Sequence, residues 1–152
     1  MTKVRGFEPV VKEHKKHDVE VTLPVRSTQN SAGYDIYLPV DVKIEPNKTV
    51  VVFTDVKAYM QPNEVLMMFV RSSIGIKRNV VLANGTGVID ADYYSNESND
   101  GNIGLALFNQ SNEVVELKAG ERVAQGVFMP FLVADNGNTN NVRTGGTGST
   151  NK

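Results

Sequence analysis

Residues 40–53 read VDVKIEPNKTVVVF, and this stretch decides the fold class. Its apolar residues Val40, Val42 and Ile44 alternate with charged ones. Alternation with a period of two places one set of side chains on a single face, which is typical of a half-buried strand. The turn sequence Glu45-Pro46-Asn47 follows and leads into three valines and a phenylalanine. The stretch therefore predicts two short strands joined by a turn.

The same patterns extend along most of the chain. Alternation recurs at 19–23 and 103–107, and short β-branched runs occupy 80–82 and 123–131. Only residues 56–60 suggest a helical turn, and no internal repeat is found. Many short strands at close spacing favour an all-β fold, an antiparallel sandwich or jelly roll.

Length and composition exclude several classes of protein. A chain of 152 residues fits one domain, and 16 basic against 17 acidic residues gives a net charge of −1. This balance argues against nucleic acid as a partner, because duplex-binding proteins carry a basic excess. The absence of cysteine excludes thiolate chemistry and disulfides. The longest apolar run, 65–70, is far shorter than the roughly 20 residues that span a bilayer. With no leader recognised, we expect a cytoplasmic protein with no membrane partner.

Two segments interrupt the strand pattern. Residues 95–100 are wholly polar and predict an exposed loop. From Ala134 the chain becomes rich in Asn, Gly and Thr, which cannot contribute to a core. The sequence thus predicts a β domain over 1–133 and a flexible C-terminal arm over 134–152.

Two segments suit the binding of an anion. Arg71-Ser72-Ser73 follows an apolar strand, and an arginine with hydroxyls and freed backbone N–H groups can hold a phosphate. A solvated basic turn is the alternative, and the segment lacks Walker A spacing. In the arm, Arg143 precedes glycines and hydroxyls that could wrap a terminal phosphate, although such tails are usually linkers.

The segment 84–94, NGTGVIDADYY, is the richest in chemistry. Asn-Gly between apolar runs predicts a hairpin, and the glycines allow the backbone to approach a flat ligand. Asp90 and Asp92 would lie on one side of an extended strand, where they could position water or a metal ion. An acidic arm that faces solvent explains the spacing equally well, and both interpretations stay open.

Five segments in this order resemble the trimeric dUTP pyrophosphatase (dUTPase) family, over about residues 23–150. They are Ala32-Gly33-Tyr34-Asp35, Arg71-Ser72-Ser73 with Gly75 and Lys77, the run 87–93, the run 120–125, and Arg143 with 145–150. The polar segment after the third motif makes the chain similar to bacterial and phage members with an insertion there. The resemblance implies a distorted antiparallel jelly roll that forms a homotrimer, with each active site built from three chains. It also implies hydrolysis of dUTP to dUMP and pyrophosphate with Mg²⁺, which lowers dUTP and supplies dUMP for thymidylate synthesis.

The resemblance also implies a role for each matched residue. Asp90 would activate the attacking water, and Asp35 would support the water shell of a Mg²⁺ ion held mainly by the triphosphate. The residues implied in substrate binding are Gly87, Val88, Ile89, Asn84 and Gly104 at uracil, Tyr93 under the deoxyribose, Arg71, Ser72, Ser73 and Gln125 at the phosphates, and Arg143, Ser149 and Thr150 over the γ-phosphate.

The chain departs from the family pattern in its arm and after the third motif. Thr147 stands where the family carries an aromatic residue that stacks on uracil, and the spacing from Arg143 to the glycines is one residue shorter. Tyr94 and the segment 95–100 follow Tyr93 where the family usually continues directly into a strand. We hypothesise that Tyr94 replaces the missing lid on uracil, the alternative being that it packs at a subunit interface.

Two alternative functions come from different classes. A dCTP deaminase-type relative of the same fold would need a glutamate beside the base, and the third motif offers no convincing candidate. A regulatory interaction protein would use residues 95–100 to contact a protein partner, and this role is compatible with catalysis.

Overall fold

The computed structural model describes residues 2–146, and these residues form an all-β fold in which every strand pair is antiparallel. The strands are β1 (Gly6–Pro9), β2 (Val25–Arg26), β3 (Tyr34–Tyr37), β4 (Val42–Ile44), β5 (Thr49–Phe53), β6 (Val56–Tyr59), β7 (Glu64–Val70), β8 (Val80–Leu82), β9 (Gly87–Asp90), β10 (Gly104–Asn109), β11 (Val115–Leu117) and β12 (Arg122–Pro130). Three single turns of helix, η1 (Lys12–His14), η2 (Ser73–Lys77) and η3 (Ala91–Tyr93), lie in the connections.

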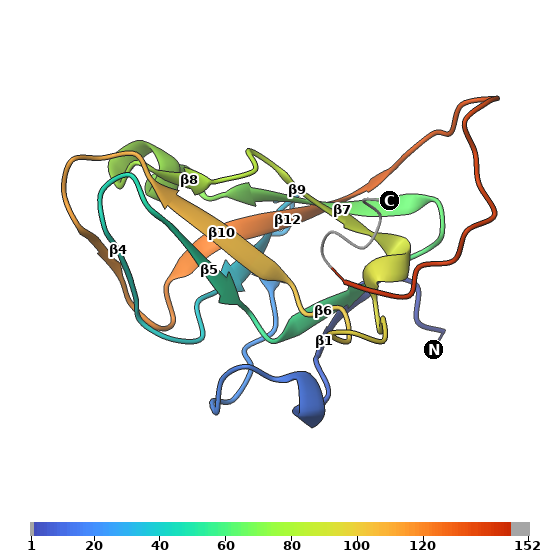
Figure 1. Cartoon of the computed structure of the whole chain (residues 1–152), viewed down its shortest axis with the longest axis horizontal. Coiled ribbons are helices and arrows are strands. Elements are labelled where there is room, and N and C mark those ends of the chain that lie inside the picture. Colours follow the sequence, from blue (N-terminus) through green and yellow to red (C-terminus); the bar gives the residue numbers. More distant parts are fainter. Residues whose placement is uncertain (1, 147–152) are drawn as a thin grey trace.

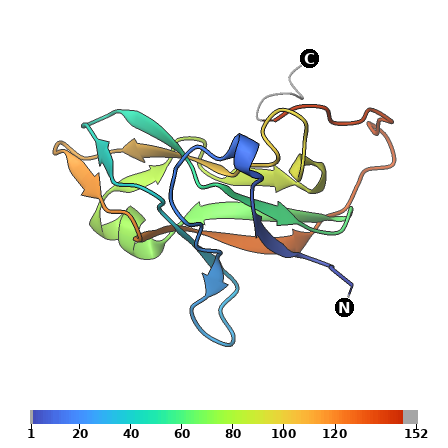
Figure 2. The same ribbon diagram turned by 90° about the horizontal axis from the view of Figure 1, so that it is seen from below.

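The strands form two larger sheets and two pairs. One sheet has the order β2-β3-β12-β7-β9 and the other β5-β10-β8, while β1 pairs with β6 and β4 with β11. Figures 1 and 2 together show the elements as two layers, with the C-terminal arm leaving from the end of β12. The connections pass repeatedly between sheets, as the jelly-roll prediction requires.

A continuous apolar core joins the two layers. On β7, Leu66 and Met68 are buried while Val65 and Met67 are partly exposed, as expected for a period of two. Buried side chains from the other strands complete the core: Ile36, Val42, Ile44, Val52, Ala58, Val80, Leu82, Leu105, Leu107, Val115, Leu117, Val123 and Ala124. β7 lies between β12 and β9 in its sheet. The core therefore holds in place the strand with which β9 and β12, and the site residues that they carry, are paired.

Most of the strand predictions are confirmed, and three local ones are wrong. Residues 19–23 form no strand, because no neighbouring strand pairs with them and Val19 remains exposed. Residues 56–59 form β6 instead of a helical turn, paired with β1. The turn at Asn84-Gly85 is present, with Gly85 at φ 76°, but the strands on its two sides join different sheets and form no hairpin.

The prediction that residues 95–100 form an exposed loop is also wrong in its main point. Asn96 and Asp100 are buried, and only Ser95, Glu97 and Ser98 are exposed. The loop, taken here as residues 95–101, turns its amide and carboxylate groups inward, where hydrogen bonds replace water.

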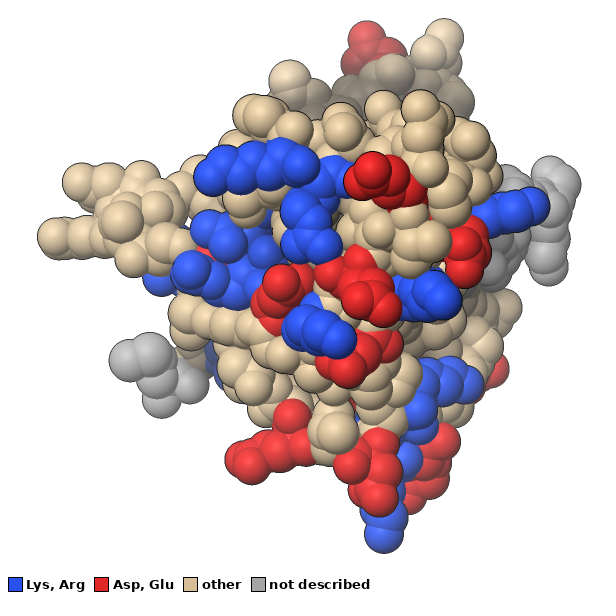
Figure 3. Space-filling model, turned by 90° about the vertical axis from the view of Figure 1, so that its left-hand side faces the viewer, with Lys and Arg blue, Asp and Glu red and all other residues tan. Residues whose placement is uncertain are grey.

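The surface carries both signs of charge. Figure 3 looks onto the end of the molecule formed by β4, β8 and η2, where Lys and Arg side chains adjoin Asp and Glu side chains. Among residues 2–146, no helix has the length and apolar character needed to cross a bilayer.

Candidate functional site

A cavity of about 210 Å³ opens between β9 and β10, where the two larger sheets meet. Among the residues that line it are eight predicted site residues, Asn84, Gly87, Val88, Ile89, Asp90, Tyr93, Gly104 and Arg143. Pockets that enclose a drug-sized ligand measure roughly 300–1,000 Å³, so this cavity suits a base with its sugar better than a whole nucleoside triphosphate. The structure thus brings together segments that are up to 59 residues apart in the chain (84 to 143).

The walls of the cavity are backbone and aliphatic groups. β9 pairs with β7, so Gly87 lies opposite Met68, and a Cβ at Gly87 would stand 2.9 Å from the Met68 Cβ. The close approach leaves room only for glycine, so the β9 backbone lines the cavity closely. Backbone N–H and C=O groups held this way present a fixed hydrogen-bonding pattern to a ligand.

Two carboxylates stand near the mouth of the cavity and share one arginine. Asp90 ends β9, and Asp92 follows in η3. The Arg143 Nη2 donates to Asp90 Oδ2 at 2.7 Å, and its Nε donates to Asp92 Oδ1 at 2.8 Å. The carboxylates remain about half exposed, at 52% and 63%, whereas the Arg143 side chain is only 9% exposed. The two aspartates share this arginine, but the extended strand on which the sequence placed them ends at Asp90, and Asp92 lies in η3.

Tyr93 forms a buried part of the same wall. Its residue is 6% exposed, and its hydroxyl donates to the Asn102 carbonyl at 2.6 Å. The Arg143 guanidinium lies 5.8 Å from the centre of its ring. The polar end of the ring thus faces the protein, which leaves its apolar body for the cavity.

A second cluster gathers around Asp35 on β3, which β12 and β7 separate from β9 in the five-stranded sheet. Asp35 is buried, and its Oδ1 pairs with Arg71 Nε at 3.2 Å while its Oδ2 pairs with Arg122 Nη1 at 3.3 Å. The Ser27 hydroxyl donates to Oδ2 at 2.6 Å. One buried carboxylate thus orients two guanidinium groups, which is a suitable arrangement for holding phosphates. Asp35 is thus a buried partner of charged groups and not a solvated side chain.

The remaining predicted phosphate ligands lie beside this cluster. Gln125 is opposite Asp35 in the ladder of β12 and β3, so their side chains share a face. Gly33 lies directly against the Gln125 side chain, so a larger residue there would displace the Gln125 amide. Ser72 and Ser73 are exposed directly after Arg71, where η2 begins. Ser27 was not predicted as part of this cluster, because no neighbouring residue in the sequence marks it as a partner of Asp35.

The two clusters are far apart within one chain. Asp90 is opposite Val65 on β7, whereas Arg71 follows the far end of that strand. The six residue steps from Val65 to Arg71 span about 20 Å at the rise of an extended strand. One chain therefore contains both a cavity that suits a nucleoside and a cluster that suits phosphates, but the two are separated.

Tyr94 is not part of the cavity lining. Its hydroxyl donates to Glu8 Oε1 at 2.5 Å, its ring meets the Tyr59 ring edge-on at 6.0 Å, and the Lys57 Nζ lies 4.9 Å from its centre. Burial and the hydrogen bond to Glu8 raise the pKa of this hydroxyl. The geometry gives no support to the hypothesis that Tyr94 covers a base, because the side chain is committed to β1 and β6.

The predicted phosphate ligands Ser149 and Thr150, and Thr147 at the place of the missing aromatic residue, lie outside the described residues. Of the arm's predicted ligands, the structure describes Arg143. Arg143 contacts Asp90 and Asp92 of its own subunit. The family resemblance instead implies that the arm of one subunit closes over a site between two others.

Among residues 2–146 no group of three or more His, Asp or Glu side chains is arranged to hold a metal ion. A single carboxylate beside arginines fits an ion that keeps most of its waters and takes its other ligands from phosphates, as Mg²⁺ does. Asp35 is that carboxylate, and since both its oxygens are already paired, it fits contact with the ion's water shell.

An all-β fold with a cavity of nucleoside size, a carboxylate in its lining and a separate arginine cluster is the architecture of a nucleotide hydrolase of the jelly-roll type. The family model described as dUTPase matches residues 19–151. The chain belongs to the dUTPase family.

Relatives and solved structures agree with this assignment. The chain is 48% identical to the deoxyuridine 5′-triphosphate nucleotidohydrolase of Lactococcus lactis, an alignment that covers 97% of this chain and 98% of the relative. A crystal structure of the dUTPase from Streptococcus mutans is 46% identical, with a TM-score of 0.75 over 86% of this chain and 99% of that one. The dUTPase of phage phi11 of S. aureus, which coordinates a structural Mg(II) ion, shares the fold at 21% identity, with a TM-score of 0.72 over 91% of this chain and 98% of that one.

Proposed function

We propose that the protein hydrolyses dUTP to dUMP and pyrophosphate in the cytoplasm, thereby lowering dUTP and supplying dUMP. The observation that carries the proposal is the cavity between β9 and β10, which has Asp90 at its mouth and Tyr93 in its wall. The 48% identity to a deoxyuridine 5′-triphosphate nucleotidohydrolase over nearly the whole chain supports the same substrate.

The cavity can select uracil by its shape and its fixed backbone groups. Cytosine exchanges the donors and acceptors of the uracil edge, so the groups on β9 and β10 would be left unpaired against it. Thymine adds a methyl group, which a closely fitting wall of backbone and aliphatic groups would exclude by contact. Tyr93 beneath the sugar leaves no room for a 2′-hydroxyl, because the ring is held at its polar end.

Asp90 is the residue we assign to activation of the attacking water. It is the carboxylate that lines the cavity, and its half-exposed position allows a water molecule to reach it. General-base catalysis needs such a carboxylate within hydrogen-bonding reach of the water. Arg143, which holds Asp90 in this structure, would turn to the γ-phosphate together with Ser149 and Thr150 when substrate is bound.

The Asp35 cluster would hold the triphosphate. Arg71, Ser72, Ser73 and Gln125 supply the positive charge and the hydrogen-bond donors that phosphoryl transfer requires. Mg²⁺ would be held by the triphosphate, with Asp35 at its water shell, and when bound it supplies further neutralisation of phosphate charge.

A trimer explains how the two clusters meet. The span of about 20 Å between Asp90 and Arg71 places the triphosphate cluster out of reach of a nucleoside in the same chain's cavity. Cyclic symmetry can bring the Asp35 cluster of one subunit to the cavity of the next, and closed rings of this kind are common among homo-oligomers. Each site is then shared between subunits.

The test of the activity is pyrophosphate release from dUTP, dTTP, dCTP and UTP, each with and without Mg²⁺. We expect kcat/KM for dUTP to exceed that for each other nucleotide by at least about 100-fold, because unpaired polar groups and steric contact both discriminate. Release of ammonia from dCTP would instead favour the deaminase-type alternative, which neither the cavity nor the comparisons support. Equal release from all four nucleotides contradicts the proposed selection.

The test of the shared site is complementation between two inactive chains. We expect Asp90→Asn and Arg71→Ala each to be inactive alone, since one lacks the base and the other a phosphate ligand. When the two are co-expressed, one site in each mixed trimer combines an intact Asp90 with an intact Arg71. Random assembly then restores about a quarter of the wild-type activity.

The control is the same two proteins purified separately and combined without refolding, which should stay inactive until their subunits have had time to exchange. A co-expressed mixture with no activity, or an active monomer in sedimentation, contradicts the shared site.

The role of residues 95–100 in binding a regulatory protein stays a prediction. The loop exposes Glu97 and Ser98 but buries Asn96 and Asp100, so only its tip is available to a partner. A pull-down with wild-type protein and with a Glu97→Ala/Ser98→Ala variant separates a partner at this tip from one bound elsewhere.

A further inference from the structure

The 95–101 loop is organised by its own asparagines. Asn96 Oδ1 accepts the backbone N–H groups of Ser98 at 3.0 Å and Asn99 at 3.1 Å. Its Nδ2 donates to the Tyr93 carbonyl at 2.8 Å and to Asn99 Oδ1 at 2.7 Å. Side-chain to backbone bonds of this kind fix a turn without regular secondary structure. The loop therefore has one defined shape, and it is attached directly to the residue that forms the cavity wall.

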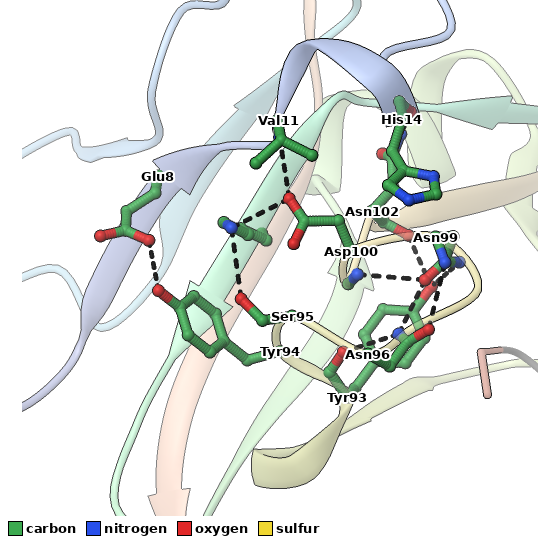
Figure 4. Close-up of polar contacts among 12 residues, drawn as sticks. Glu8, Val11, His14, Tyr93, Tyr94, Ser95, Asn96, Asn99, Asp100 and Asn102 are labelled. Atoms are coloured by element: carbon green, nitrogen blue, oxygen red, sulfur yellow. Dashed lines mark hydrogen bonds and ion pairs between the residues drawn. The ribbon is translucent and has the colours of Figure 1, made fainter. Parts of the chain in front are cut away.

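Asn99 connects this loop to the hydroxyl of Tyr93. Its Nδ2 donates to the Tyr93 oxygen at 2.9 Å, while its Oδ1 accepts from Gly101 N at 3.0 Å and from Asn96. The same hydroxyl donates to the Asn102 carbonyl at 2.6 Å. Figure 4 shows Asn99, Asn102 and the Tyr93 ring side by side, with these bonds converging on the hydroxyl. The Tyr93 hydroxyl is thus held by Asn99 within the loop and by Asn102 directly after it.

The other side of Asn99 faces the C-terminal arm. A Cβ built at Gly146 would stand 2.9 Å from both Asn99 Nδ2 and Ser98 Oγ. Gly146 is buried there, and three residues earlier Arg143 reaches across the Tyr93 ring to Asp90. Tyr93 therefore lies between the loop and the arm, and Asn99 touches both.

We infer that Asn99 is a positioning residue that holds the Tyr93 ring against the sugar and provides the contact on which the arm rests. The inference depends on the proposed function, because it assigns Tyr93 to the deoxyribose. A ring held by two hydrogen bonds cannot shift to admit a 2′-hydroxyl. A ring that has lost the bond to Asn99 can yield to the larger sugar. Asn99 thereby contributes to the choice of deoxyribonucleotide over ribonucleotide, although it does not line the cavity.

The test compares kcat/KM for dUTP and UTP in wild-type protein and in Asn99→Ala. We expect the ratio of the two to fall by about 5- to 30-fold, as for loss of one hydrogen bond in a buried site. Asn112→Ala is the matched control, because Asn112 is an exposed loop asparagine remote in sequence from the site, and its ratio should equal that of the wild type. An unchanged ratio in a folded Asn99→Ala protein overturns the inference.

Tyr93→Phe removes the same bond, together with the bond to the Asn102 carbonyl, and leaves the hydrogen bonds of Asn96 in place, so it serves if Asn99→Ala fails to fold. We expect it to lower the ratio at least as much as Asn99→Ala, and the double variant to show no loss beyond that of Tyr93→Phe, because Asn99 acts through a bond that Tyr93→Phe has already removed. Additive losses would mean that Asn99 does not act through the hydroxyl.

Gly146→Ala tests the contact with the arm. The added methyl has no space against Ser98 and Asn99, so we expect a lower kcat for dUTP and UTP alike, with their ratio unchanged. A normal kcat contradicts the arm contact. If wild-type protein released no pyrophosphate from dUTP, the proposed function itself would fail, an outcome distinct from all of these.

Discussion

Asp90→Asn is expected to lower kcat for dUTP by about 10² to 10⁴, the usual loss when general-base catalysis is removed. The amide keeps the size of the carboxylate and can still accept a hydrogen bond, but it cannot take a proton from water. Binding of dUTP should change little, since the cavity wall is made by the backbone of β9 and β10 and by Tyr93. Single-turnover hydrolysis and equilibrium binding of a non-hydrolysable dUTP analogue measure the two effects separately.

Asp92→Asn is the matched control for this variant. Asp92 pairs with the same arginine, at 2.8 Å, but does not line the cavity. Its replacement therefore weakens the contact with Arg143 by a similar amount and leaves the water-activating group in place. We expect less than about a tenfold effect on kcat, as for an exposed ion pair. Equal losses in the two variants would mean that the aspartates act by holding the arm and not through the water.

The site was more predictable from the sequence than the local structure around it. The run 87–93 and Arg71-Ser72-Ser73 carry residue types that suit a ligand whatever their neighbours, and the structure brings the first of these to a cavity. The strand at 42–44 was predictable because its alternation reports directly which side is buried. These signals are local, so one sequence is enough to read them.

The errors occur where a partner distant in sequence decides the outcome. Residues 19–23 alternate as a strand should, but no neighbouring strand pairs with them. Asn84-Gly85 forms its turn, yet β8 pairs with β10 and β9 with β7, because the core of two sheets determines those pairings. Alternation and turn residues describe one segment only, whereas strand pairing depends on two.

The 95–101 loop shows the same limit for polar residues. A run of Ser, Asn, Glu and Asp predicts exposure because each group needs hydrogen bonds, and water is their usual source. Here the protein supplies them: Asp100 accepts from Val11 N at 2.8 Å and from Lys57 Nζ at 2.9 Å. Nothing in residues 95–100 alone could identify partners 89 and 43 positions away.

That buried pair gives the largest expected effect on stability. The side chains of Lys57 and Asp100 are 8% and 10% exposed, so Lys57→Ala leaves a carboxylate buried without its counterion. Removing one partner of a buried ion pair typically costs about 3–5 kcal/mol. Lys57 also lies against the Tyr94 ring, which packs on the strand pair β1–β6. The N-terminal strand should therefore loosen together with the loop.

Lys118→Ala is the control for this variant, because its partner Asp41 is 4.0 Å away and both side chains are more than 60% exposed. Its effect should remain below about 0.5 kcal/mol. Unfolding in denaturant at one fixed protein concentration, with hydrogen exchange of the β1 and β6 amides, measures both variants. A Lys57→Ala protein as stable as Lys118→Ala would contradict the assignment of the pair as a structural link between loop and N-terminus.

The pH dependence of stability gives an independent check on the same pair. Burial alone would raise the pKa of Asp100, but the Val11 N–H and Lys57 outweigh it and hold that pKa below the ordinary value of 3.8. Because the folded pKa is the lower one, the stabilisation is complete above 3.8 and is lost as the pH falls through the folded value. In Lys57→Ala the Asp100 carboxylate stays buried but has lost its counterion, so the loss of stability should begin at a higher pH. Acid unfolding curves that superimpose for the wild type and Lys57→Ala, after correction for overall stability, would show that Asp100 is not held in its charged form by Lys57.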